Sequence, residues 1–178
     1  PPSGSGDPEG QYIYWMARER PHWKIINCGV AGQRTDEIRA RFESAINTYR
    51  PNYIVILAGV NDIYQGYPLE AAARNLAWMY EQAQLKGVIP VAATVLPCDV
   101  LSSQQSKEID ALNNWIRKTA GKLRIPVADL HSAVADPKTP WKLSGSPDGR
   151  HPDIGGYRRM GKVVLQALDA MEADHPPR

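Results

Sequence analysis

The sequence has no long hydrophobic run, and its positive and negative charges nearly balance. No apolar stretch approaches the roughly 20 residues that a helix needs to span a bilayer. The net charge is only +2 and no long basic run is present, so neither nucleic acid nor an anionic membrane surface is indicated as a partner. The first ten residues have neither the basic nor the apolar region of a signal peptide. The compartment is left open, as is the oligomeric state.

Cysteine is scarce as well. Cys28 and Cys98 lie in separate segments, and their spacing matches no metal site. We predict two buried free thiols, with a disulfide between them as the alternative.

The overall composition is that of a soluble globular protein, with 43% hydrophobic and 22% charged residues. A chain of 178 residues suits one domain with a substantial core.

Short apolar runs alternate with longer amphipathic stretches about four times along the chain. The runs are nearly continuous in apolar residues, which predicts strands buried on both faces of a parallel sheet. They cover residues 23–30, 53–60, 88–96 and 126–130. Helical spacing of apolar residues follows them at residues 38–49, 69–83, 109–123 and 157–171, with a further helix over about 11–19. Thr35 is the expected N-cap of one helix and Gly87 the C-cap of the next.

Alternating strands and helices predict a three-layer α/β fold with right-handed crossovers, in a single domain spanning residues 1–178. Ligands of such sheets bind beyond the carboxyl ends of the strands. That rule selects four segments, residues 28–35, 59–62, 97–103 and 136–151. The last lies in a long polar loop rich in proline and glycine, and structureless loops of that length are usually functional.

The strongest chemical signal is Asp148 followed three residues later by His151, just before the last predicted helix. A carboxylate at that spacing can orient an imidazole and stabilise its protonated form, as the acid member of a Ser-His-Asp triad does. Taken alone, the pair is more often a turn-capping aspartate beside a surface histidine, because short motifs recur by chance.

Two further signals lie at predicted strand ends. Asn61 follows the central apolar run, where its amide could donate a hydrogen bond to a developing oxyanion. Gly32 precedes a predicted helix, where its backbone N–H could do the same and the missing side chain allows close approach. Each has an equally good structural explanation, as a turn residue after a strand and as a tight strand-to-helix connection.

Together the three segments resemble the SGNH hydrolase family, also called GDSL-type esterases and lipases. Its blocks correspond to the glycine context ending at Gly32, to Gly59-Val60-Asn61-Asp62 and to Asp148-Gly149-Arg150-His151-Pro152. The resemblance covers nearly the whole chain and implies a flavodoxin-like α/β/α sandwich with a mostly parallel sheet. It also implies Gly32 and Asn61 as oxyanion donors, His151 as general base and Asp148 as its orienting partner. No metal or organic cofactor is implied.

The chain departs from the family in its first block, Gly-Asp-Ser-Leu, which is absent. The family's nucleophilic serine ends the first strand, and counting back from Gly32 places it at or before residue 1. Ser3 and Ser5 lie in a Pro/Gly-rich stretch that we interpret as loop. In the family the first strand lies in the centre of the sheet, between the second and third. Without that strand, two apolar strand edges would be left unpaired.

The predicted function is hydrolysis of a carboxylic ester through an acyl-enzyme, without a cofactor. The substrate is a small acyl ester, a lysophospholipid or an acetylated sugar. The alternative is a non-catalytic module on the same fold that binds an acyl or carbohydrate ligand. Trp141, in the long loop, is the aromatic residue expected beside a substrate, unless it only anchors the loop.

Overall fold

The computed structural model describes residues 8–174 of the chain. These residues group into two compact units that interleave along the sequence. Unit 1 combines the described parts of Pro1–Gly29 and Ala128–Arg178 with the short segment Leu96–Leu101. Unit 2 consists of Val30–Val95 and Ser102–Val127. Each unit has its own helices and its own buried side chains.

Unit 2 contains the parallel sheet that the apolar runs predict. Strands β1 (Tyr53–Ile56) and β2 (Ile89–Ala93) pair in parallel, with Tyr53 opposite Ile89 and Ile56 opposite Ala92. The strand order is β1-β2-β3, where β3 (Val127–Ala128) begins at the end of unit 2. The Ala92 N–H donates to the Pro126 carbonyl at 2.9 Å and so joins β2 to the start of β3.

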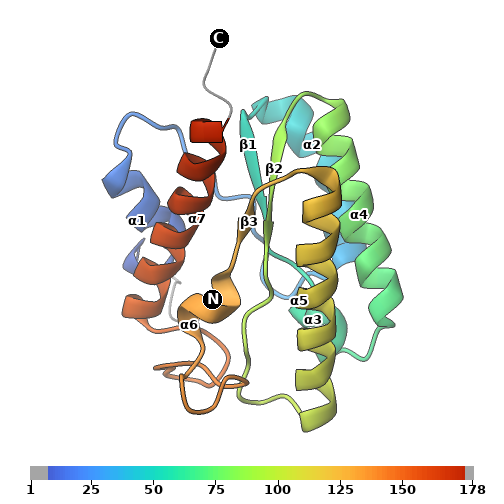
Figure 1. Ribbon diagram of the computed structural model, residues 1–178, viewed down its shortest axis with the longest axis vertical. Coiled ribbons are helices and arrows are strands. Elements are labelled where there is room, and N and C mark those ends of the chain that lie inside the picture. The colour runs from blue at the N-terminus through green and yellow to red at the C-terminus, as the bar shows by residue number, and fades with distance from the viewer. Residues whose placement is uncertain (1–7, 175–178) are drawn as a thin grey trace. The chain divides into compact units, whose positions relative to one another are not determined.

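Three long helices of unit 2 form one layer beside β1 and β2 (Figure 1). They are α2 (Thr35–Tyr49), α4 (Leu69–Leu85) and α5 (Ser103–Leu123), and a short helix α3 (Val60–Tyr64) follows β1. Their apolar stripes meet in a core whose largest side chains are fully buried, as the helical spacing predicts. Those of unit 2 include Leu76, Met79, Tyr80, Leu112 and Ile116.

The helix ends differ from prediction by single residues. Thr35 is the first residue of α2, and Arg34 takes the N-cap position, where its backbone N–H donates to the Glu37 carboxylate at 2.9 Å. Gly87, with φ of 72°, directly follows the C-cap Lys86 of α4, in the left-handed conformation that favours glycine there. Glycine therefore ends α4 as the sequence predicts.

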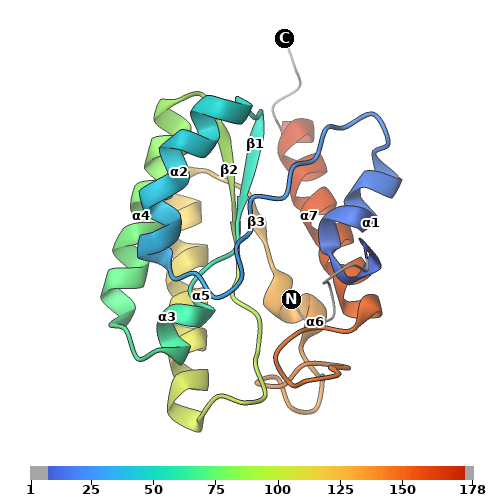
Figure 2. The ribbon, with the colours of Figure 1, turned by 180° about the vertical axis from the view of Figure 1, so that it is seen from behind.

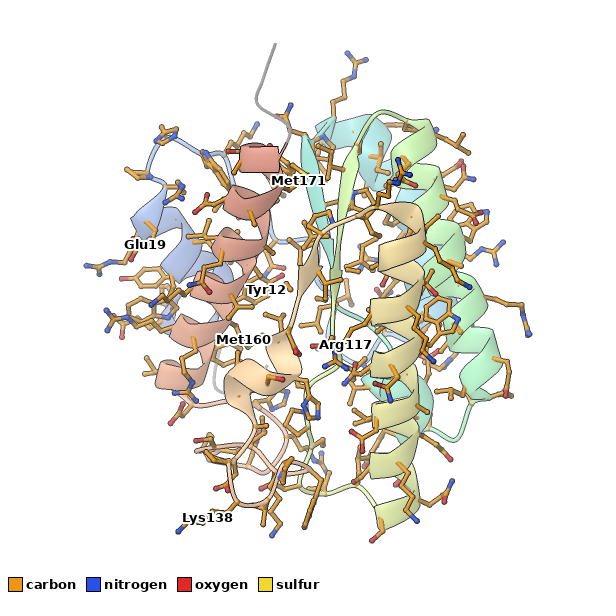
Figure 3. All side chains as sticks on the ribbon, in the orientation of Figure 1. Tyr12, Glu19, Arg117, Lys138, Met160 and Met171 are labelled. Atoms are coloured by element: carbon orange, nitrogen blue, oxygen red, sulfur yellow. The ribbon has the colours of Figure 1, made fainter. Side chains whose placement is uncertain are left out.

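Unit 1 is built on a close helix pair, α1 (Tyr12–Glu19) and α7 (Ile154–Asp174), side by side in both ribbon views (Figures 1 and 2). Gly161 makes this approach possible, because a Cβ there would lie 2.8 Å from the Tyr12 carbonyl oxygen. Met160, labelled on α7 in Figure 3, is 1% exposed. The short helix α6 (Leu130–Val134) and the turn Pro8–Gly10 complete the unit.

One predicted strand is wrong. Residues 23–30 form no strand, and Ile26 and Val30 are 38% and 56% exposed. An isolated extended segment becomes a strand only when a neighbour satisfies its backbone groups, and no strand of residues 8–174 pairs with this one. The other strands are shorter than predicted. Val60 already begins α3 after β1, Leu130 begins α6 after β3, and β2 ends at Ala93.

The cysteine prediction is half right. Cys28 and Cys98 are both free thiols, but only Cys98 is buried, because Cys28 lies in the exposed segment that forms no strand. None of the described helices is long and apolar enough to cross a membrane.

Candidate active site

Unit 1 carries the predicted histidine–aspartate pair. Asp148 Oδ2 lies 2.7 Å from His151 Nδ1, so the contact that the three-residue spacing predicts is present. The other carboxylate oxygen, Oδ1, accepts the backbone N–H groups of Arg150 at 2.9 Å and of His151 at 2.8 Å. One carboxylate thus fixes both the backbone turn and the ring of His151.

The loop that carries the pair is held by two further side chains of the same unit. Ser146 Oγ donates to the His151 carbonyl at 2.7 Å. The Asp99 N–H donates to the Gly149 carbonyl at 2.8 Å, and the Asp99 carboxylate accepts the Leu143 N–H at 2.8 Å. Asp99 belongs to the segment after β2 that the strand-end rule selects, but no motif in the sequence marks it individually.

Hydrogen bonding shifts the pKa of Asp148 well below its usual range. The largest cause is the hydrogen bond with the His151 ring. Burial is the next largest effect and acts in the opposite direction, and the N–H groups of Arg150 and His151 lower the pKa further. The carboxylate is therefore ionised at neutral pH and accepts a hydrogen bond from Nδ1. A neutral imidazole protonated on Nδ1 has its basic lone pair on Nε2.

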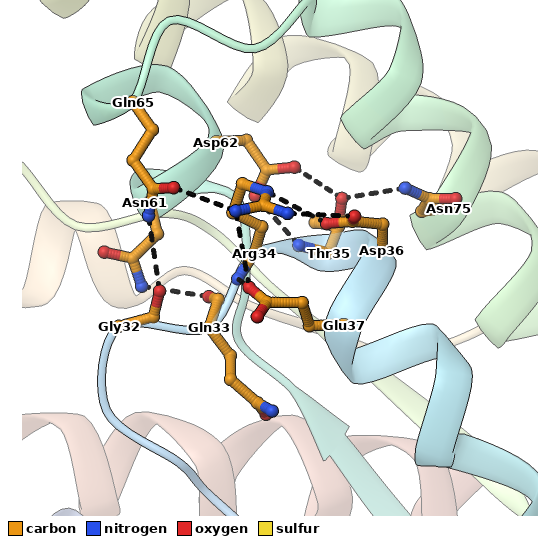
Figure 4. A network of polar contacts seen from close by, with 10 residues as sticks. All are labelled: Gly32, Gln33, Arg34, Thr35, Asp36, Glu37, Asn61, Asp62, Gln65 and Asn75. Atoms are coloured by element: carbon orange, nitrogen blue, oxygen red, sulfur yellow. Dashed lines mark hydrogen bonds and ion pairs between the residues drawn. The ribbon is translucent and has the colours of Figure 1, made fainter.

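The two predicted oxyanion donors lie in unit 2. Gly32 is exposed and has φ of 80°, a conformation that favours glycine. Asn61, half-buried, is the second residue of α3, and its Nδ2 donates to the Gln33 carbonyl at 2.9 Å (Figure 4). A carboxamide carries two N–H donors, so this contact orients the amide and uses one of them.

Gly59, which precedes α3, is required by both conformation and packing. Its φ is 122°, and a Cβ there would lie 2.6 Å from Leu112 Cδ2 and 3.3 Å from Val95 Cγ2. Glycine at this position lets α3 begin directly against the core of unit 2, which sets the position of Asn61.

Two further residues belong to the segments selected at the strand ends, Trp141 and Arg34. Trp141 is 55% exposed, so it does not anchor the loop in a core, and its place beside a substrate stays a prediction. Arg34 forms an ion pair with Asp36 at 3.1 Å and lies over the Tyr67 ring, 4.1 Å from its centroid. No group of three or more His, Cys, Asp or Glu side chains with the geometry of a metal site occurs within residues 8–174.

The candidate residues therefore form two pairs. Asp148 and His151 are brought together in unit 1, and Gly32 and Asn61 in unit 2, where Asn61 and Gln65 donate to the backbone of Gln33 and Gly32. That all four face one cavity stays a prediction.

A carboxylate-bound histidine on an α/β fold is an arrangement that hydrolases with a Ser-His-Asp triad use, and the match to a known family model identifies the family. The model of the GDSL-like lipase/acylhydrolase family matches residues 2–159. The chain belongs to this family, as its three motifs predict.

Curated relatives are esterases and a lipoprotein. An acetylxylan esterase of Geobacillus stearothermophilus is 19% identical over 157 residues, which cover 82% of this chain and 72% of that protein. An uncharacterised lipoprotein of Bacillus subtilis is 32% identical over 85 residues, 44% of this chain. The chain spans only 35% of that lipoprotein's length. The family and the acetylxylan esterase relative support an ester hydrolase in general.

Solved structures of the family share the fold. A GDSL-like lipase from Bacteroides thetaiotaomicron superposes with a TM-score of 0.75 at 24% identity, covering 88% of this chain and 82% of that one. An acetylxylan esterase from Geobacillus stearothermophilus, a catalytic mutant, superposes with a TM-score of 0.75 at 14% identity, over 89% and 80% of the chains. At these identities the likeness shows the fold, and the predicted α/β/α class with a mostly parallel sheet is confirmed.

Proposed function

We propose that this chain belongs to a serine esterase in which His151 is the general base, Asp148 orients it, and Gly32 and Asn61 stabilise the oxyanion. The observation that carries the proposal is the 2.7 Å contact between Asp148 Oδ2 and His151 Nδ1. With Nδ1 engaged, Nε2 is the nitrogen that accepts a proton from a serine hydroxyl.

The reaction has two steps. The serine oxygen attacks the ester carbonyl while its proton moves to His151 Nε2, and the carbonyl oxygen becomes an oxyanion held by the Gly32 N–H and the Asn61 amide. The intermediate collapses, the bond to the alcohol oxygen breaks, and His151 returns the proton to the alcohol. Water then attacks the acyl-enzyme by the same route and releases the acid.

The nucleophile comes from a segment that precedes Pro1, where it ends a central strand of the sheet. The missing Gly-Asp-Ser block supports this origin. Two structural findings agree with it: β1 is the end strand of the described order, and the exposed segment ending at Val30 pairs with no described strand. A strand adjoining β1 would cover the edge of β1 that no described strand pairs with.

The substrate is a carboxylic ester, either a small acyl ester, a lysophospholipid or an acetylated sugar. The fold alone does not choose between them, because the family uses one catalytic arrangement for many substrates. The acetylxylan esterase among the relatives favours the acetylated sugar.

The test compares residues 1–178 with the same chain extended upstream to include the preceding strand. The extended chain should hydrolyse p-nitrophenyl acetate and form a covalent serine adduct with an organophosphate, and His151→Ala should abolish turnover. Residues 1–178 alone should give at most slow hydrolysis by activated water.

Three other outcomes contradict parts of the proposal. An extended chain that binds acyl ligands but never forms the adduct is a binding module rather than an esterase. Activity of residues 1–178 that disappears with Ser3→Ala or Ser5→Ala places the nucleophile inside the chain. Full activity of His151→Ala removes the assigned base.

A further inference from the structure

The two segments that supply the proposed oxyanion donors are joined by a buried carboxylate. Asp62, next to Asn61, is 2% exposed, and Thr35, three residues after Gly32, is fully buried. Asp62 Oδ2 accepts the Thr35 N–H at 2.9 Å, and Oδ1 accepts the Thr35 hydroxyl at 2.6 Å. These two bonds connect α3 to the first residue of α2 (Figure 4).

The position of Asp62 suits a carboxylate for a second reason. The first N–H groups of a helix have no partner within the helix, and its N-terminus carries partial positive charge. Helix α2 begins at Thr35, and the Asp62 carboxylate binds that first N–H from another element. A buried anion here is satisfied by hydrogen bonds and by the helix end.

The hydrogen bonds run in one direction through Thr35. Asn75 Nδ2 donates to Thr35 Oγ1 at 3.0 Å, and the Thr35 hydroxyl in turn donates to Asp62 Oδ1. Arg39 donates to Asn75 Oδ1 at 3.1 Å, which establishes that the Asn75 nitrogen faces the threonine. Every polar group in this chain of bonds therefore has a defined role as donor or acceptor.

We infer that Asp62 is a positioning residue for the oxyanion hole. It holds residues 32–35 against α3, so that the Gly32 N–H and the Asn61 amide keep a fixed separation. The inference rests on the proposed function for the donors themselves. Oxyanion donors stabilise the transition state fully only when they are preorganised. Loss of the Asp62–Thr35 hydrogen bonds therefore lowers the rate of the chemical step rather than substrate binding.

The test exploits the direction of the bonds. In Asp62→Asn, the introduced N–H and the Asn75 N–H both point at Thr35 Oγ1, and the threonine proton loses its acceptor. Adding Asn75→Asp supplies that acceptor. In Asp62→Asn/Asn75→Asp, residue 62 donates to the Thr35 hydroxyl and the hydroxyl donates to residue 75, so the direction of the bonds is reversed at unchanged net charge. Asp110→Asn, on the exposed side of α5, is the matched control for the loss of one carboxylate.

In the whole protein, Asp62→Asn should lower kcat about tenfold to a hundredfold, because small displacements of catalytic groups cost that much. KM should change less than about twofold. In residues 1–178, hydrogen exchange of residues 29–34 should accelerate in Asp62→Asn. Both effects should revert in the double variant, and Asp110→Asn should behave as wild type. A purely structural role would lower the unfolding temperature of Asp62→Asn without these local changes.

The outcomes separate the inference from the proposed function. If Asn61→Ala lowers kcat but Asp62→Asn does not, the positioning role is overturned and the esterase assignment stands. If kcat and hydrogen exchange do not recover in the double variant, the role assigned to the Asp62–Thr35 hydrogen bonds is wrong. If Asn61→Ala leaves kcat unchanged, the oxyanion assignment itself fails. In that case, unchanged hydrogen exchange of residues 29–34 in Asp62→Asn would also reject the connecting role of the Asp62–Thr35 hydrogen bonds.

Discussion

At the scale of single residues, the decisive feature is how Asp148 is used. One of its oxygens binds the His151 ring and the other binds two backbone N–H groups, so its charge supports both the base and the turn that presents it. Local spacing is sufficient for this arrangement, because all partners lie within three residues.

The lowered pKa of Asp148 predicts how the stability of its loop depends on pH. A carboxylate whose pKa is depressed on folding contributes stability above its unfolded pKa of about 3.9, and that contribution is lost as the pH falls through the folded pKa. The loop should therefore keep its contacts at pH values where ordinary aspartates are half protonated. Carboxyl carbon NMR should show Asp148 titrating below the usual range of aspartate side chains.

His151→Ala is the matching variant, since it removes the largest cause of the shift. The Asp148 midpoint should then rise toward the ordinary value. A wild-type Asp148 midpoint within the usual range of aspartate side chains would contradict the hydrogen-bond assignment.

At the scale of elements, the short helix α3 depends on the glycine before it. Gly59→Ala should destabilise residues 1–178 by about 2–4 kcal/mol, because the new methyl group meets Leu112 and the positive φ disfavours alanine. Urea unfolding measures this loss. Gly121→Ala in α5 is the control, since a Cβ there has open space, and it should stabilise by up to about 1 kcal/mol. Equal effects of the two changes would show that packing at Gly59 is not limiting.

At the scale of the whole molecule, the open edge of the sheet predicts how an added strand changes stability. If a preceding strand adjoins β1, the chain extended upstream should unfold at a temperature higher by at least ~4 °C than residues 1–178, which corresponds to a gain of roughly 1–2 kcal/mol. A Gly/Ser-rich leader of equal length is the control, and it should leave the unfolding temperature unchanged. Equal unfolding temperatures of the two extended chains would reject the missing strand.

The sequence by itself determined the fold class, the order of the motifs and the Asp148–His151 contact. Each depends on periodicity or on near neighbours, such as the apolar run that becomes β2 and the glycine that ends α4. Such features are encoded within a few residues, so they can be predicted without knowing what packs against them.

Only the tertiary structure decided the rest. Residues 23–30 have a strand's composition but form none, because strand formation depends on a neighbouring backbone that composition does not supply. The hydrogen bonds of Asp62 to Thr35 and of Asp99 to Leu143 and Gly149 join segments far apart in the chain. No local pattern predicts these partners, because they lie in segments that only the folded chain brings together.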